Sequence, residues 1–208
     1  MRGDVSGTDA TLIPGYAYGN ASLRPSPVTV AELELLKLTV GWTPDDEVAL
    51  RLAGHVLEGQ TKKIVDHWRR QIIGNIPHLA RHSKTPDGMP LPEYSQRSGA
   101  RFEQWILDTC LRQYDQDWLN YQNEIALRHM VPGKNKTDGV QSTPFVPLRD
   151  IVAFIPVMNE TIRSYLAAKG HRAIEVERMH VAWCKSVQLQ VALWLRPYSD
   201  SGVLRSQW

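Results

Sequence analysis

The sequence predicts an all-α fold. Apolar residues recur at intervals of three and four along most of the chain, clusters of Gly and Pro separate these stretches, and the sequence contains no alternating run flanked by hairpin-type turns. The 208 residues suffice for one domain with a sizeable core. We therefore expect a single helical domain at 28–198, preceded by an arm at 1–27 and followed by a tail at 199–208.

The arm at 1–27 is dense in Gly and Pro, which favours irregular structure. It also holds the segment IPGYAYG at 13–19, in which Tyr16 and Tyr18 carry large aromatic rings. Leaving these rings in water forgoes the stabilisation that burial gives. We therefore expect this part of the arm to pack on the helical body.

Two N-cap signals mark the start of the first helices. Thr29 precedes an apolar face that ends near Val40, and Thr43 stands before Pro44 and two acidic residues. A capping hydroxyl, a proline in the first turn and carboxylates near the positive end of the helix dipole all favour helix initiation. The sequence therefore predicts a short helix after Thr29 and a second helix after Thr43.

An apolar stripe runs from Val48 past Gly59 to Ile72, which fits either two helices or one bent helix. The region 74–92 is rich in Pro and Gly and leaves room for one short helix near 77–83.

Four longer helical patterns complete the domain, at 93–112, 115–130, 147–169 and 173–195. A loop of about 17 residues, a length that is commonly functional or disordered, separates the second of these from the third. The last two patterns are apolar over a broad arc, so their helices need a second surface to cover them. We therefore expect a homodimer formed through these two helices.

Charge and hydropathy argue against several classes of partner. The formal net charge is +2 with the signs interspersed, so no basic stripe for nucleic acid is present. No stretch approaches the roughly 20 apolar residues that span a bilayer, and the N-terminus has no apolar signal core. We expect a cytoplasmic protein that binds neither nucleic acid nor membrane.

Histidine is the main candidate for chemistry, because the sequence has no glycine-rich phosphate loop, HExxH, CxxC or Gly-x-Ser-x-Gly motif. His129 ends the apolar face of its helix, close to the helix break at Pro132 and Gly133, where a side chain can face a cavity. From spacing alone, a core or helix-end role for His129 is more common than metal ligation. Phe102, on the preceding helix, is placed to face it across a space. Solvated or helix-terminal roles are expected for the other histidines, which are His55, His67, His78, His82, His171 and His180. Of these, His180 could also line a helix interface.

Four separated segments together resemble the protoglobins. They are IPGYAYG at 13–19, RFEQWILDT at 101–109, WLNYQNEIALRH at 118–129 and LQVALW at 189–194. The resemblance spans the chain from about residue 13 to 198, in the same order. It implies a globin-like 3-over-3 helical sandwich with an extra N-terminal helix, an arm that helps to bury haem b, and dimerisation through the last two helices.

The resemblance also implies roles for individual residues. His129 matches the proximal histidine, the fifth ligand of the haem iron. The expected walls of the pocket are apolar and aromatic, with the arm packing over the haem region. The cofactor-binding residues implied here are His129, Trp68, Phe102, Ile125, Phe154 and Tyr16.

The chain departs from the family pattern mainly on the distal side. Arg69 follows Trp68 where a tyrosine is usual, and Ser98 replaces a larger apolar residue. We expect these two residues to be the polar influence on a bound ligand, although Arg69 could instead reach a haem propionate or solvent. Arg101 is a candidate propionate partner, with a solvated arginine as the alternative.

Three further departures concern backbone and size. The stretch 69–77 is one residue longer than the family pattern. Met130 stands where a second histidine is common, which removes a competing imidazole. Pro156 within the penultimate helix either bends the wall of the pocket near Phe154 or is a tolerated kink.

The resulting functional hypothesis is reversible binding of O2, CO or NO at a pentacoordinate haem iron held by His129. Two alternatives remain. One is a gas sensor that acts through a separate partner. The other is a haem-dependent enzyme that turns over nitrogen oxides or peroxide, or transfers carbenes in engineered use, with a distal arginine polarising the bound group.

Overall fold

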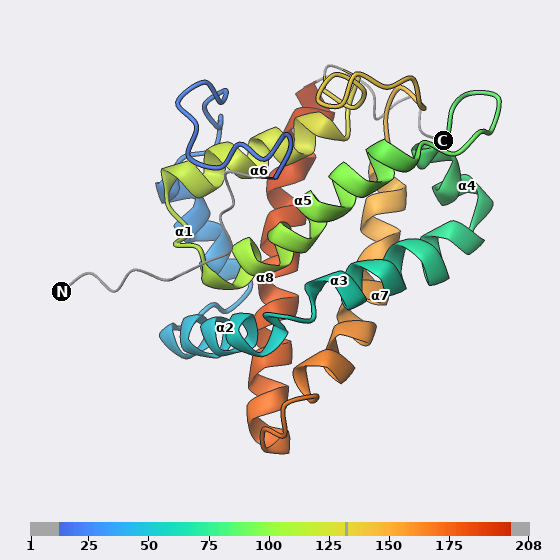
Figure 1. Cartoon of the computed structure of the whole chain (residues 1–208). Coiled ribbons are helices and arrows are strands. Elements are labelled where there is room, and N and C mark those ends of the chain that lie inside the picture. Colours follow the sequence, from blue (N-terminus) through green and yellow to red (C-terminus); the bar gives the residue numbers. More distant parts are fainter. Residues whose placement is uncertain (1–12, 132, 201–208) are drawn as a thin grey trace.

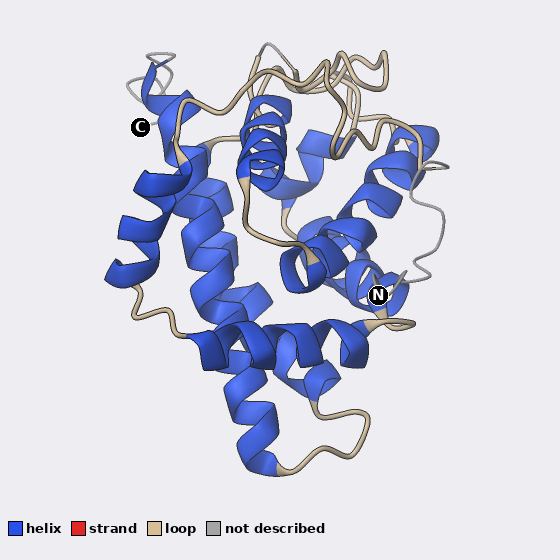
Figure 2. Cartoon of the chain, turned by 90° about the vertical axis from the view of Figure 1, so that its left-hand side faces the viewer, coloured by secondary structure: helices blue, strands red, loops and turns tan. Residues whose placement is uncertain are grey.

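The computed structural model describes residues 13–131 and 133–200, and within these ranges it consists of helices and loops (Figures 1 and 2). The all-α prediction is confirmed. The elements are α1 (Val30–Thr39), α2 (Pro44–Leu57), α3 (Thr61–Asp66), the π-helix η2 (His67–Ile72), the 3-10 helix η3 (Ile73–Asn75), α4 (Pro77–Ala80), the 3-10 helix η4 (Arg81–Ser83), α5 (Pro92–Leu111), α6 (Gln116–Arg128), α7 (Leu148–Leu166) and α8 (Ala173–Asp200).

Both predicted N-caps form complete capping boxes. The Thr29 side chain accepts a hydrogen bond from the backbone of Glu32, whose carboxylate accepts one in return. Thr43 and Asp46 repeat the arrangement at the start of α2. Each box satisfies backbone N–H groups that the helix itself leaves unpaired, which explains why these two starting points were predictable from the local sequence.

The apolar stripe from Val48 to Ile72 forms two helices rather than one. Helix α2 ends at Leu57 and α3 begins at Thr61. Between them, Gly59 adopts a φ of 80°, a left-handed conformation that only glycine adopts without strain. This residue therefore allows the chain to turn between the two helices.

Helix α3 continues directly into the π-helix η2. The backbone N–H of Ile73 reaches the carbonyl oxygen of Trp68, five residues earlier, as well as that of Arg69. A π-turn holds one residue more than an α-turn. Segment 67–72 therefore holds one residue more than a regular α-helical turn would.

Helix α8 is the centre of the molecule. Helices α2, α5 and α6 pack across it and α7 packs alongside it, which gives the globin-like sandwich with α1 as the additional first helix (Figure 1). The broad apolar arc of α8 is thus largely covered within one chain, although Ile174, Val181 and Leu195 remain exposed. Helix α8 also extends beyond its predicted end at 195 because Tyr198 is fully buried and packs with Met130 and Leu148.

Helix α7 runs unbroken through Pro156, whose side chain is exposed, so this proline does not end the helix. None of the helices in residues 13–131 and 133–200 is long and apolar enough to cross a membrane.

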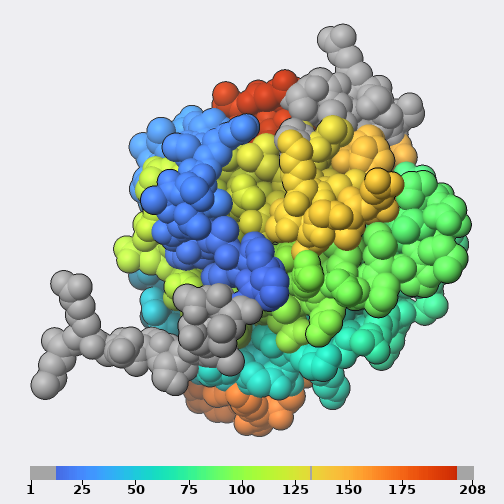
Figure 3. All heavy atoms as spheres, turned by 45° about the horizontal axis from the view of Figure 1, so that its top comes forward, coloured from blue at the N-terminus to red at the C-terminus, as the bar shows by residue number. Residues whose placement is uncertain are grey.

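The described part of the arm packs on α6, as the sequence predicts. The ring of Tyr121 makes edge contacts with Tyr16 and Tyr18, with ring centroids 5.3 Å and 5.5 Å apart. Figure 3 shows this segment lying over α6 and reaching the loop that follows it.

Candidate functional site

A cavity of about 310 Å³ lies between α5, α6 and α7, closed by the segment 69–83 and by the loop after α6. This volume falls at the lower end of the range for cofactor and ligand pockets. Several of the residues predicted from the sequence line it: Arg69, Ser98, Arg101, Phe102, Ile125, His129 and Phe154. Trp68 and Tyr16 do not.

His129 lies at the C-terminal end of α6 and faces this cavity. Its Nδ1 atom is 2.8 Å from the carbonyl oxygen of Ile125. Because a carbonyl can only accept, Nδ1 carries the proton and Nε2 keeps its lone pair. Burial lowers the pKa of His129, which favours the neutral ring. Nε2 has no hydrogen-bond partner among the described residues and is free to bind a metal.

Trp194 of α8 stacks on the His129 ring, with centroids 6.2 Å apart and planes 28° apart. The indole is itself fixed, because its Nε1 donates a hydrogen bond to Gln122 Oε1 at 3.0 Å. The imidazole is therefore held by packing as well as by the Ile125 carbonyl. In the sequence Trp194 is one of many apolar residues at 173–195, and helical spacing cannot show which of them touches a ligand.

The walls next to His129 are apolar. Phe102 and Trp105 come from α5, and Phe154 and Met158 come from α7. Such side chains exclude water and favour a flat hydrophobic group.

Trp68 lies behind this wall rather than in it. Its side chain is fully buried, and its ring packs on Phe102 with centroids 5.3 Å apart. Its Nε1 donates a hydrogen bond to Thr161 Oγ1 of α7 at 2.7 Å. The indole therefore supports Phe102 and ties η2 to α7, because Phe102 stands between it and the cavity.

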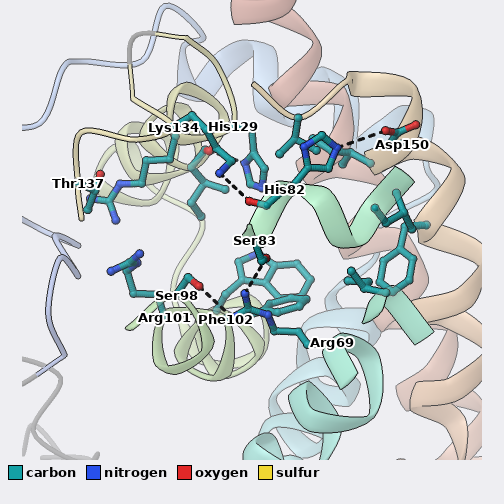
Figure 4. A pocket seen from close by; sticks show the side chains of 18 of the residues that line it. Arg69, His82, Ser83, Ser98, Arg101, Phe102, His129, Lys134, Thr137 and Asp150 are labelled. Atoms are coloured by element: carbon teal, nitrogen blue, oxygen red, sulfur yellow. Dashed lines mark hydrogen bonds and ion pairs between the residues drawn. The ribbon is translucent and has the colours of Figure 1, made fainter. Parts of the chain in front are cut away.

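Arg69 is the residue that η2 brings to the cavity. Its Nη1 donates to the Ser95 carbonyl at 2.8 Å and to Ser98 Oγ at 2.9 Å, and its Nη2 donates to Ser83 Oγ at 3.4 Å. Burial lowers the pKa of Arg69. Figure 4 shows Arg69 and His129 on opposite sides of the pocket.

Arg101, the predicted propionate partner, is engaged by the protein itself. Its guanidinium forms an ion pair with Asp138 at 2.5 Å and donates to the Pro14 carbonyl at 2.7 Å. A second arginine on the cavity wall, Arg128, pairs with Glu124 at 2.7 Å. These pairings neutralise both guanidinium groups.

One corner of the cavity is polar, and no sequence pattern indicates it. His82, expected to be solvated or helix-terminal, lies in η4 and is only 7% exposed. Its Nδ1 lies 2.7 Å from Thr143 Oγ1, and its Nε2 lies 3.6 Å from Asp150. Burial and the nearby Arg81 lower the pKa of His82 to about 4. Lys134, which is 5% exposed, donates to the His82 carbonyl and to the Tyr94 hydroxyl, both at 3.0 Å (Figure 4).

Tyr16 lies outside the cavity because its hydroxyl is drawn to α5. It donates to Asp108 Oδ2 at 2.7 Å. The neighbouring Gly15 carbonyl accepts a hydrogen bond from Arg128 at 2.6 Å. Since Arg101 and Arg128 both line the cavity and both hold the arm, the arm covers the outer side of these two arginines.

The residues present fit a haem. Haem iron needs one strong protein ligand, and the lone pair of His129 Nε2, in a ring of fixed tautomer, would supply it. The porphyrin needs apolar walls, which Phe102 and Phe154 provide. Its carboxylates need cations, and Lys134 lines the cavity without a carboxylate partner among the described residues.

Comparison with known families agrees with this geometry. The protoglobin family model matches residues 29–203, which begins at the N-cap of α1. No curated protein matches the chain. Because the family model covers most of the sequence and the structure is a globin-like helical sandwich, this chain belongs to the protoglobin family.

Proposed function

We propose that this chain binds haem b through His129 and reversibly binds a diatomic gas, O2, CO or NO, at the iron. The observation that carries the proposal is the His129 ring, whose Nδ1 is fixed by the Ile125 carbonyl at 2.8 Å while Nε2 is free in an apolar cavity. When bound, the haem supplies an iron with one open position.

The chain's own residues prepare the site in two ways. The Ile125 carbonyl holds the proton on Nδ1 and makes Nε2 a better donor to a metal. Phe102 and Phe154 exclude water from the cavity, which protects a reduced metal centre from side reactions. Neither step requires a change in protonation state.

The experiment is to load the purified chain with haem and record visible spectra of the ferric, ferrous and CO-bound forms. The proposal predicts stoichiometric uptake, a ferrous spectrum typical of a single histidine ligand, and CO that is released by light and rebinds. Absence of haem uptake would contradict the haem assignment. A six-coordinate ferrous form that excludes CO would contradict gas binding alone.

Arg69 favours a second candidate function, which is turnover of peroxide or nitrogen oxides. A fixed cation on the side of the cavity opposite His129 can stabilise negative charge that develops on a reacting oxygen. Steady-state turnover with peroxide or nitrite as substrate separates catalysis from simple binding. Turnover no faster than that of free haem would leave gas binding as the function.

We also propose that the chain forms a homodimer through α7 and α8. Support comes from apolar side chains on these helices that remain exposed in the single chain: Val152, Ile174, Val181 and Leu195. Sedimentation of the wild type and of Val181→Lys tests this. The proposal predicts a dimer that the lysine disrupts, and a monomeric wild type at micromolar concentration would contradict it.

A further inference from the structure

The charges around the cavity do not balance. Four of the described residues that line it carry a guanidinium or ammonium group: Arg69, Arg101, Arg128 and Lys134. Arg101 and Arg128 are neutralised by Asp138 and Glu124. The bonds of Arg69 and Lys134 go only to neutral acceptors, namely hydroxyls and backbone carbonyls. A positive charge held away from water without a counter-charge is unfavourable, so it marks a place where an anion is stabilised.

Arg69 retains donors for such an anion. A guanidinium has five N–H groups. Three hydrogen bonds to described residues use Nη1 twice and Nη2 once, and the bond to Ser83 is long at 3.4 Å. Nε and one N–H of Nη2 therefore have no partner among the described residues. Lys134, in contrast, donates two of its three N–H groups and lies 4.8 Å from the centre of the Tyr94 ring, which also stabilises a cation.

The fold holds Arg69 in this position. The π-turn of η2 places Trp68 in the core and the next residue, Arg69, at the cavity. Ser98 is small enough to leave room for the guanidinium. Ser98 Oγ donates to the Tyr94 carbonyl at 2.6 Å, so its lone pairs are directed to Arg69. These contacts come from α5 and fix the side chain without neutralising it.

We propose that Arg69 makes this cavity a binding site for small inorganic anions, such as fluoride, azide or nitrite, in the ferric haem protein. This inference rests on the proposed haem function and names a class of ligand distinct from the neutral gases. The anion gains charge-assisted hydrogen bonds from Arg69, which a neutral diatomic molecule cannot match. Its negative charge also offsets that of the Arg69 guanidinium, which has no carboxylate partner among the described residues.

The test is optical titration of the ferric protein with fluoride and with azide at neutral pH and fixed ionic strength. Arg69→Met removes the charge at similar length. Arg70→Met is the matched control, because it removes the same net charge at the adjacent position. The Arg70 side chain is 77% exposed and paired with Asp66. The ferrous affinity for CO serves as the neutral-ligand control.

We expect Arg69→Met to weaken both anions by about 10- to 100-fold, the range for a lost hydrogen bond to a charged group. Arg70→Met should leave anion affinity close to that of the wild type because salt screens exposed charges. CO affinity should change far less than anion affinity in Arg69→Met. If Arg69→Met does not retain haem, Arg69→Gln, which keeps an N–H donor for Ser98, should show the same selective loss.

Three results would overturn the inference. The first is unchanged anion affinity in an uncharged variant at position 69 that retains a normal haem spectrum. The second is an equal loss of anion and CO affinity. The third is a loss of haem affinity without any loss of anion affinity, which would mean that Arg69 balances the haem carboxylates. Failure of the wild type to take up haem would overturn the proposed function and this inference together. It is distinct from the three results above, which all require a haem-loaded wild type.

Discussion

The His129 Nδ1 atom lies 2.8 Å from the carbonyl oxygen of Ile125, four residues earlier in the chain. The last carbonyls of a helix have no backbone N–H to accept from, and α6 ends at Arg128. The helix end therefore supplies the acceptor that fixes the tautomer of the ring. This local feature of the backbone leaves the lone pair on Nε2.

Trp68→Phe should lower the free energy of unfolding by about 1–3 kcal/mol, because the smaller ring leaves space and loses the hydrogen bond to Thr161. The visible spectrum of the haem protein and its CO off-rate should stay the same, since Phe102 separates Trp68 from the cavity. Phe102→Leu, which alters the wall itself, provides the comparison for the off-rate. An equal change in off-rate for both variants would place Trp68 in contact with the ligand.

Gly54→Ala should destabilise the protein by about 1–3 kcal/mol through overpacking. A Cβ at this position would lie 2.7 Å from Leu111 Cγ and 2.9 Å from Cys110 Cβ, where α2 crosses α5. Urea unfolding measures the loss. In Gly54→Ala/Leu111→Ala the loss should be smaller than the sum of the two single losses, because the clash is removed. Additive losses would show that Leu111 is not the obstacle.

Stability should fall as the pH is lowered from about 6.5 towards 4, partly because of His82. Its pKa in the folded chain is lowered to about 4, so in this window the unfolded chain binds a proton that the folded chain does not. Arg81 and Lys134 oppose protonation of His82, and Asp150 favours it. Across this pH range, the free energy of unfolding should fall by about 1–3 kcal/mol less in His82→Gln than in the wild type. An unchanged slope would assign the pH dependence to other groups.

Tyr16→Phe should loosen the arm. It removes the hydroxyl that donates to Asp108 at 2.7 Å, and about 1 kcal/mol of local stability corresponds to a roughly fivefold increase in opening. Limited proteolysis within residues 13–27 measures this opening. Tyr18→Phe is the matched control, since its ring also packs on Tyr121 while its hydroxyl has no hydrogen bond to a described residue. Equal cleavage of both variants would contradict a role for the Asp108 bond.

The sequence predicts most accurately what depends on neighbouring residues. The capping boxes at Thr29 and Thr43 are read from four-residue patterns, and both form as predicted. The π-turn at His67–Ile72 is visible only in the structure, because helical periodicity does not show where a turn holds an extra residue. Periodicity also places Trp68 correctly on a buried face, although it cannot show that Phe102 stands in front of it.

The polar wall of the cavity could not be predicted because it joins segments far apart in the chain. Lys134 donates to the carbonyl of His82, 52 residues earlier, and each residue taken alone resembles a solvated loop residue. The sequence also does not show how many helices surround α8, so it cannot tell which part of the broad apolar arc the chain itself covers. With α2, α5, α6 and α7 packed around α8, most of that arc is buried, while Ile174, Val181 and Leu195 stay exposed.

The central claim, that His129 is the iron ligand, is tested most directly by the spectrum of His129→Gly with and without added imidazole. His180→Ala is the control, because His180 is half-buried and bonded to the Asn159 carbonyl away from the cavity. We predict that His129→Gly loses the histidine-ligated ferrous spectrum, that imidazole restores it, and that His180→Ala retains it. A His129→Gly protein with the wild-type spectrum in the absence of imidazole would contradict the assignment.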